Sequence, residues 1–200
     1  MDFAALQTEF YANGFDYLND GGAGETRAKR WINQSYQELC ALEDWPFLET
    51  TTTGTAPLTI SDLGKVLYVV NTDNYQTLWE ADQKSISATS YPGGSGAWAH
   101  YYYVTGGDTI ATAPAASNGL SVRYIKVPTD LSATSDEPEV PAAYHDIIVL
   151  GAVRRALLDD TDAGSLAVVK QEWNERVQMM QSALLNPITS QYITGQSEDW

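Results

Sequence analysis

The spacing of apolar residues predicts two helices at the start of the chain. From Asp2 to Leu18 apolar side chains recur at intervals of three and four, and the segment NDGGAGE then ends the first helix. The second helix is expected to begin at Glu25 or Thr26 and to end before Pro46, because proline has no N–H to donate and disfavours helix in the preceding residue. The positions expected to be buried are Phe3, Leu6, Phe10, Tyr17 and Leu18 in the first helix and Ala28, Trp31, Ile32, Tyr36, Leu39 and Leu42 in the second.

The period falls to two from Phe47 to about Val127, as in β-strands. Runs rich in β-branched residues predict the strands TTTTG, LTI, KVLYVVNT and TLWEAD, and the Gly/Ser-rich segment SYPGGSGAW interrupts them. Three further runs, AWAHYYYV, DTIATA and LSVRYIKV, are joined by TGGD and PAASNG, which contain residues that accept a positive φ. These three runs predict a three-stranded meander.

Helical spacing returns after an acidic connector that contains Pro128 and Pro138. The segment EVPAAYHDIIVLGAVRRALLDDTD, from Glu139 to Asp162, predicts a third helix with Pro141 in its first turn. Its middle carries no charge from Ile147 to Val153, so this helix is apolar nearly all round and must be covered on every side. A fourth, amphipathic helix is expected from about Asp162 to Leu185, with a stripe of Leu166, Val169, Trp173, Val177, Met180 and Leu184.

The order of these elements indicates an α+β fold. We expect a four-helix bundle formed by the N- and C-terminal segments, residues 1–46 and 138–186, with a small antiparallel β domain and its linker inserted at 47–137. Residues 187–200 have no apolar period and are expected to form an extended C-terminal arm. Cys40 is the only cysteine and lies in a helical pattern, where a small buried apolar role is expected.

The charge of the chain is strongly one-sided, with 26 acidic and 11 basic residues and a formal net charge of −15. This balance argues against a surface that grips nucleic acid, which needs clustered Lys and Arg. It is compatible with a surface past which DNA slides, but from charge alone plain solubility is the favoured interpretation. No stretch approaches the roughly 18 apolar residues of a membrane span, and no export signal is recognised, so we expect a soluble protein without membrane partners.

The residue pattern offers no catalytic or metal-binding arrangement. His100 alternates with tyrosines in a predicted strand, and His145 is followed by an aspartate that points elsewhere on a helix. Asp159, Asp160 and Asp162 cluster at a helix junction, where capping explains them. The loops GGSG and TGGD lack the lysine of a phosphate-binding loop and are predicted to be hairpin turns. We therefore expect no catalytic residue, no cofactor and no metal.

A family resemblance lies in an ordered succession of segments. From Tyr101 to Leu185 these are YYYVTGGDTIATAPAAS, LSVRYIKVPTDLS and DEPEVPAAYHDIIVLGAVRRALL, and the earlier segment AKRWINQSYQELCALEDWPFLE fits the same pattern. In this succession the chain resembles the head-to-tail adaptor (connector) proteins of tailed bacteriophages. Thr51–Gly96 departs from the family pattern.

The resemblance implies a structural, non-enzymatic virion protein of the neck, made in the cytoplasm of the host bacterium. Copies would form a homo-oligomeric ring of about twelve, docked on the portal protein. The ring would extend the DNA channel to the stopper or tail, and DNA would pass without specific binding during genome packaging and ejection. The arm would bind the portal, with Ile188, Tyr192, Ile193 and Trp200 as its anchors.

Two interpretations of the apolar third helix stay open, namely packing inside the bundle and packing between subunits. Small residues would let another helix approach closely, and the paired arginines suit carboxylates in the same bundle or across an interface. The residues concerned are Ile147, Ile148, Gly151, Ala152, Arg154, Arg155 and Trp173. The alternative functions are another neck or tail component, such as a stopper or tail terminator, and a glycan-binding or glycan-hydrolysing tail-associated protein.

Overall fold

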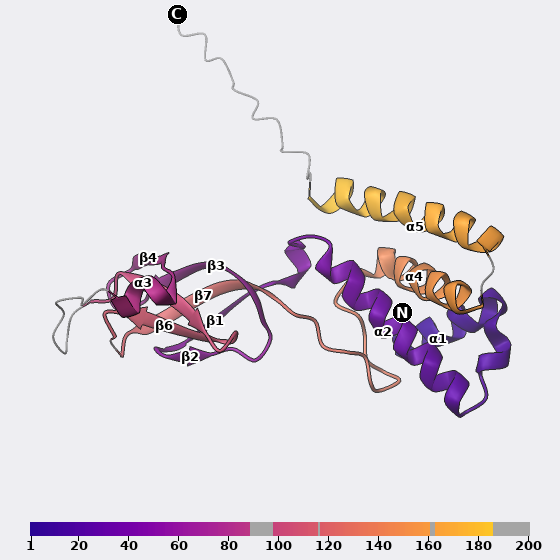
Figure 1. Cartoon of the computed structure of the whole chain (residues 1–200), viewed down its shortest axis with the longest axis horizontal. Coiled ribbons are helices and arrows are strands. Elements are labelled where there is room, and N and C mark those ends of the chain that lie inside the picture. Colours follow the sequence, from indigo (N-terminus) through magenta and orange to yellow (C-terminus); the bar gives the residue numbers. More distant parts are fainter. Residues whose placement is uncertain (89–97, 116, 161–162, 186–200) are drawn as a thin grey trace, which may run out of the picture. The chain divides into compact units, whose positions relative to one another are not determined.

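A computed structural model describes residues 1–88, 98–115, 117–160 and 163–185 of the chain and shows a mixed α+β fold (Figure 1). The chain divides into two compact units. The helical unit comprises Met1–Leu39 and the chain from Leu131 onward, and the β unit comprises Cys40–Asp130. Two segments that are far apart in the sequence therefore build the helical unit together.

The first helical segment is broken near its middle. Helix α1 spans Phe3–Phe10 and is followed by a π-helical turn, Tyr11–Phe15, and a 3₁₀ turn, Asp16–Leu18. Gly14 has a φ of +97°, which residues with a side chain rarely adopt, so the helical spacing does not continue through it. Phe15 is consequently buried, whereas Tyr17 is 61% exposed. The prediction that Tyr17 is buried is wrong.

Helix α2, Ala23–Ala41, begins after an aspartate that satisfies its free N–H groups. The Asp20 carboxylate accepts hydrogen bonds from the backbone N–H groups of Gly22, Gly24 and Glu25, and these bonds lower the pKa of Asp20. Five of the six predicted buried positions are confirmed: Ala28, Trp31, Ile32, Tyr36 and Leu39. Leu42 is exposed instead, because α2 ends one residue before it.

Helix α4, His145–Asp159, is the centre of the helical unit (Figure 1). A 3₁₀ turn, Ala142–Tyr144, precedes it, and it contacts both α1 and the long helix α5, Ala163–Leu184. Along α5, the predicted stripe is buried at Trp173, Val177 and Met180 and partly buried at Leu166, Val169 and Leu184.

The β unit contains one seven-stranded sheet in the order β1-β7-β3-β4-β5-β6-β2. A 3₁₀ turn, Pro46–Leu48, leads into it, and the buried Cys40 precedes that turn as expected for a small apolar residue. The elements are β1 Glu49–Thr55, β2 Leu58–Thr59, β3 Leu63–Asn71, β4 Gln76–Glu80, α3 Gln83–Ala88, β5 Tyr101–Thr105, β6 Thr109–Ala113 and β7 Gly119–Lys126.

Strand pairing differs from the sequence prediction in two respects. β5 and β6 form the expected antiparallel hairpin, but β7 pairs with β1 and β3, so the three-stranded meander is wrong. Leu120, Val122 and Tyr124 are buried along β7, which fits a strand with neighbours on both sides. β4 and β5 are parallel, so the sheet is not purely antiparallel. The chain between them contains α3, and parallel neighbours need such a crossover.

Candidate functional site

The small residues of α4 allow close contact with two other helices. A β-carbon added at Gly151 would lie 2.0 Å from Oγ of Ser35 on α2 and 3.1 Å from Nε1 of Trp173 on α5. Only glycine fits between α2 and α5 at this level without a shift of the packed interior. The neighbouring residues expected to pack, Ile147, Ile148 and Ala152, are fully buried within one copy of the chain.

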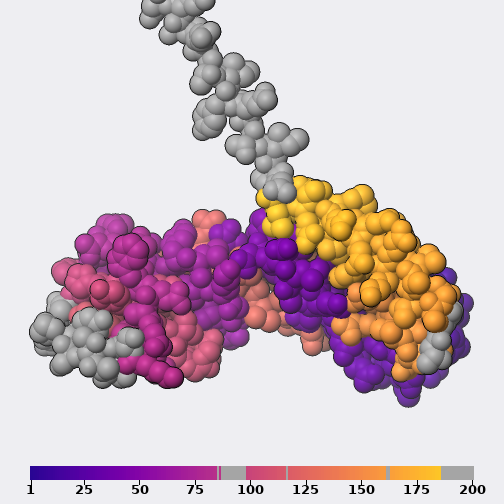
Figure 2. All heavy atoms as spheres, turned by 45° about the horizontal axis from the view of Figure 1, so that its top comes forward, coloured from indigo at the N-terminus to yellow at the C-terminus, as the bar shows by residue number. Residues whose placement is uncertain are grey.

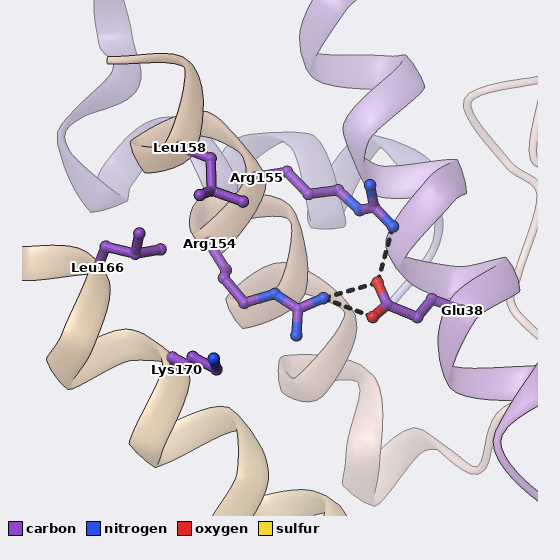
Figure 3. A pocket seen from close by; sticks show the side chains of 6 residues that line it. All are labelled: Glu38, Arg154, Arg155, Leu158, Leu166 and Lys170. Carbon is purple, nitrogen blue, oxygen red and sulfur yellow. Dashed lines mark hydrogen bonds and ion pairs between the residues drawn. The ribbon is translucent and has the colours of Figure 1, made fainter. Parts of the chain in front are cut away.

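Two arginines at the end of this apolar stretch share one carboxylate (Figure 3). One guanidinium nitrogen of Arg154 donates to both carboxylate oxygens of Glu38, at 2.7 and 2.6 Å. Arg155 donates to one of the same oxygens at 2.7 Å. Glu38 lies on α2 and both arginines lie on α4, so these charge-assisted hydrogen bonds join the N-terminal and C-terminal segments.

Arg154 is also held by an aromatic ring. Its guanidinium lies 4.3 Å from the ring centroid of Trp173 on α5, and only 14% of its side chain is exposed. A cation over an indole ring is attracted by the ring quadrupole, more strongly where water is excluded. Glu38 and Trp173 therefore fix Arg154 from two different helices. Nε of the adjacent Arg155 is also buried and has no hydrogen-bond partner within the described residues.

A pocket of about 340 Å³ opens beside these groups (Figure 3). Leu158 of α4 and Leu166 of α5 supply apolar walls, and Lys170 of α5 adds a third cation. The six lining residues are Glu38, Arg154, Arg155, Leu158, Leu166 and Lys170, which we call the basic pocket. Three cations face one carboxylate, so the basic pocket carries excess positive charge and suits the recognition of an anion.

His145 links the first residue of the chain to the start of α4. Its ring is buried, its Nε2–H donates to the carbonyl of Val140 at 2.7 Å, and its Nδ1 accepts from the Met1 ammonium at 2.7 Å. Burial lowers the pKa of His145, and the hydrogen bond to Val140 opposes this shift only in part. The carboxylate of the adjacent Asp146 accepts from Arg176. The geometry thus gives His145 a structural position.

The aspartates at the end of α4 bind the N-terminal segment. Arg27 donates to Asp159 at 3.2 Å, and the Tyr17 hydroxyl donates to Asp160 at 2.8 Å. Side chains from elsewhere in the helical unit thus take up these two carboxylates. Capping at the junction before α5 stays a prediction, because residues 161–162, which include Asp162, lie outside the described residues.

Sequence reasoning missed Glu38 and Lys170. Each is a charged residue at the edge of an apolar helical stripe: Glu38 lies beside Leu39 on α2, and Lys170 lies four residues after Leu166 and three before Trp173 on α5. A charge at helical spacing within such a stripe is the available signal. The predicted portal-binding residues Ile188, Tyr192, Ile193 and Trp200 lie outside the described residues.

Metal binding and membrane insertion find no support in the part of the chain that the structure describes. Within residues 1–88, 98–115, 117–160 and 163–185, no group of three or more His, Cys, Asp or Glu residues is arranged to hold a metal ion. None of the helices in these ranges is long and apolar enough to cross a membrane.

Comparison with known families finds a match that spans nearly the whole chain. The model of the family described as SU10 adaptor protein matches residues 1–191. No match is found among curated proteins. Because the family match spans nearly the whole chain, including both segments of the helical unit and the entire β unit, the chain belongs to the SU10 adaptor protein family, a family of structural phage head-to-tail adaptors.

Proposed function

We propose that copies of this chain form a closed ring of about twelve at the virion neck. The ring docks beneath the portal protein and extends the DNA channel to the stopper or tail. The observation that carries this proposal is the family match over residues 1–191. A four-helix bundle of α1, α2, α4 and α5 would be the rigid part of each subunit, and the β domain, residues 47–137, would fold as a separate part.

Apolar side chains exposed on the helical unit support contacts with other chains. Val168 and Met179 on α5 are 67% and 59% exposed. They are eleven residues apart, which is about three turns, so they share one side of the helix. That side is opposite to the one buried through Trp173 and Val177, and the space-filling view shows α5, in yellow, along the surface of this unit (Figure 2). A neighbouring subunit would cover these residues.

The β unit also exposes large aromatic residues. Tyr75 and Trp79 are 87% and 73% exposed, and Trp98 is half exposed. Tyr75 has a φ of +59°, an uncommon backbone conformation for a bulky residue. Exposed aromatic groups are the usual anchors of protein–protein contacts, so they support contacts of the β unit with neck or tail partners.

The remaining proposals concern the wall of the DNA channel, the C-terminal arm and the place of synthesis. An acidic channel wall repels DNA phosphates, so a ring of subunits at −15 each would let DNA slide during packaging and ejection. The arm, residues 187–200, would bind the portal through Ile188, Tyr192, Ile193 and Trp200. Synthesis would take place in the cytoplasm of the host bacterium.

Reconstitution with the portal tests this function. Purified chain would be mixed with purified portal rings, and the complexes would be imaged by electron microscopy. We expect a ring of about twelve copies on one face of each portal. A variant that ends at residue 186 should keep the melting temperature of the full chain and lose portal binding. Failure of the full chain to bind the portal at any ratio would contradict the proposal.

A further inference from the structure

Positive charge is scarce in this chain, and five of its 11 basic residues form ion pairs with carboxylates of their own. Of the 11 basic residues, Arg27, Lys29, Lys65 and Arg123 each have a carboxylate partner among the described residues, and Arg176 has two. In these pairs the carboxylates equal or outnumber the cations.

In the basic pocket, by contrast, the cations outnumber the carboxylates. Arg154 and Arg155 share the single carboxylate of Glu38. Lys170 is exposed at the pocket wall and forms no ion pair with any residue that the structure describes. An anion that enters the basic pocket would meet Lys170 and two arginines already held by Glu38, with Arg154 also fixed by the ring of Trp173. Preorganised cations lose little side-chain freedom on binding.

The walls of the basic pocket favour a protein group over a free inorganic ion. Leu158 is exposed at the wall, and Leu166 on α5 lines the same pocket. Such walls suit an apolar side chain next to the anionic group. A carboxylate beside an apolar residue in a polypeptide offers both features, and arginine matches the planar carboxylate geometry.

We propose that the basic pocket binds an aspartate or glutamate side chain, with its neighbouring apolar residue, from a second copy of this chain. The inference rests on the proposed ring. Each copy in a closed ring presents two different, complementary surfaces, one to each neighbour. With 26 acidic residues and a net charge of −15, copies repel one another over most of their surface. The basic pocket is a place where this repulsion turns into attraction.

Zero-length cross-linking of purified particles tests the proposal. A carbodiimide joins a lysine Nζ to a carboxyl carbon in direct contact, and the displaced carboxyl oxygen leaves in the urea by-product. We expect a covalent dimer of this chain in which mass spectrometry finds Lys170 joined to an aspartate or glutamate. Particles carrying Lys170→Arg should contain the chain in normal amount and lose this cross-link, because arginine keeps the charge but does not form the amide.

A charge reversal provides a second, independent readout. Lys170→Glu should reduce the number of copies per particle at least fivefold. Lys29→Glu on α2 is the matched control, since it makes the same change of charge outside the basic pocket, and should keep nearly the normal number. Lys170 is exposed and Lys29 is partly exposed, so thermal melting should show both variants folded.

The possible outcomes separate this inference from the proposed function. If the chain is present in particles but Lys170 is never joined to a second copy, the inference is wrong and the ring proposal stands. A cross-link from Lys170 to the portal or to a tail protein would likewise overturn the choice of a second copy. If the chain is absent from particles, the proposed function itself fails.

Discussion

Gly151 on α4 lies against Ser35 on α2 so closely that even a methyl group at Gly151 would require the Ser35 hydroxyl to move. A β-carbon at Gly151 would be 2.0 Å from Oγ and 3.0 Å from Cβ of Ser35. Both residues are buried, so neither can turn toward solvent. This contact sets how closely a helix of the N-terminal segment approaches a helix of the C-terminal segment, and with it the position of Glu38 relative to Arg154.

Replacing this glycine tests the contact directly. Gly151→Ala should lower the free energy of unfolding by about 1–3 kcal/mol, because the added methyl group overpacks the interior. Combining it with Ser35→Gly moves the glycine to the other helix, and the double variant should lie within about 1 kcal/mol of the original protein. Urea denaturation measures both differences. An equal loss in the single and double variants would show that the helices do not meet at this point.

The arginine held by Glu38 and Trp173 has a matched counterpart on the surface. Arg27 also has a carboxylate partner, Asp159, and an indole, Trp31, but its side chain is 47% exposed. Arg154→Met should lower the free energy of unfolding by about 2–3 kcal/mol, because it leaves a half-buried carboxylate with one partner fewer. Arg27→Met should change it by less than about 1 kcal/mol. Similar losses of unfolding free energy for the two variants in urea denaturation would contradict the greater burial of Arg154.

Burial of His145 makes stability depend on pH in a defined direction. The pKa of His145 is lowered from 6.5 in the folded chain, so below pH 6.5 the unfolded chain binds a proton that the folded chain does not. The contribution of His145 to the free energy of unfolding is therefore fully present above pH 6.5. It is lost as the pH falls toward the pKa that His145 has in the folded chain. Urea titrations between about pH 5 and pH 8 should show a slope that disappears in His145→Asn. The control His100→Gln should keep the slope.

Replacing Trp79, the exposed tryptophan of β4, tests assembly separately from folding. Trp79→Gln should leave the free energy of unfolding within about 0.5 kcal/mol of the original, because the side chain is 73% exposed. If the residue anchors a neck partner, the same variant should lower the amount of chain in purified particles several-fold. A variant that folds normally and enters particles normally would remove Trp79 from the contact surface.

Local patterns predicted the helices well because apolar spacing reports burial directly. Ala28, Trp31 and Ile32 on α2 are buried as their spacing indicates. Tyr17 failed because one glycine, Gly14, breaks the helix and ends the period on which the prediction depended. The spacing of apolar residues alone does not show where a glycine breaks a helix.

Strand pairing and the basic pocket depended on long-range geometry. Alternation identifies β7 as a strand, but nothing in its own residues says that β1 and β3, rather than β6, are its neighbours. The arginines were recognised as partners for carboxylates, yet Glu38 is 116 positions from Arg154 in the chain. Only folding brings together the three helices that contribute Glu38, the arginines and Lys170.

The number of copies in the virion is the most direct test of the adaptor ring. Quantitative mass spectrometry of purified particles would compare this chain with the major capsid protein. The proposed neck ring predicts about a dozen copies per particle. Absence of the chain from particles, or a copy number in the hundreds, would contradict it.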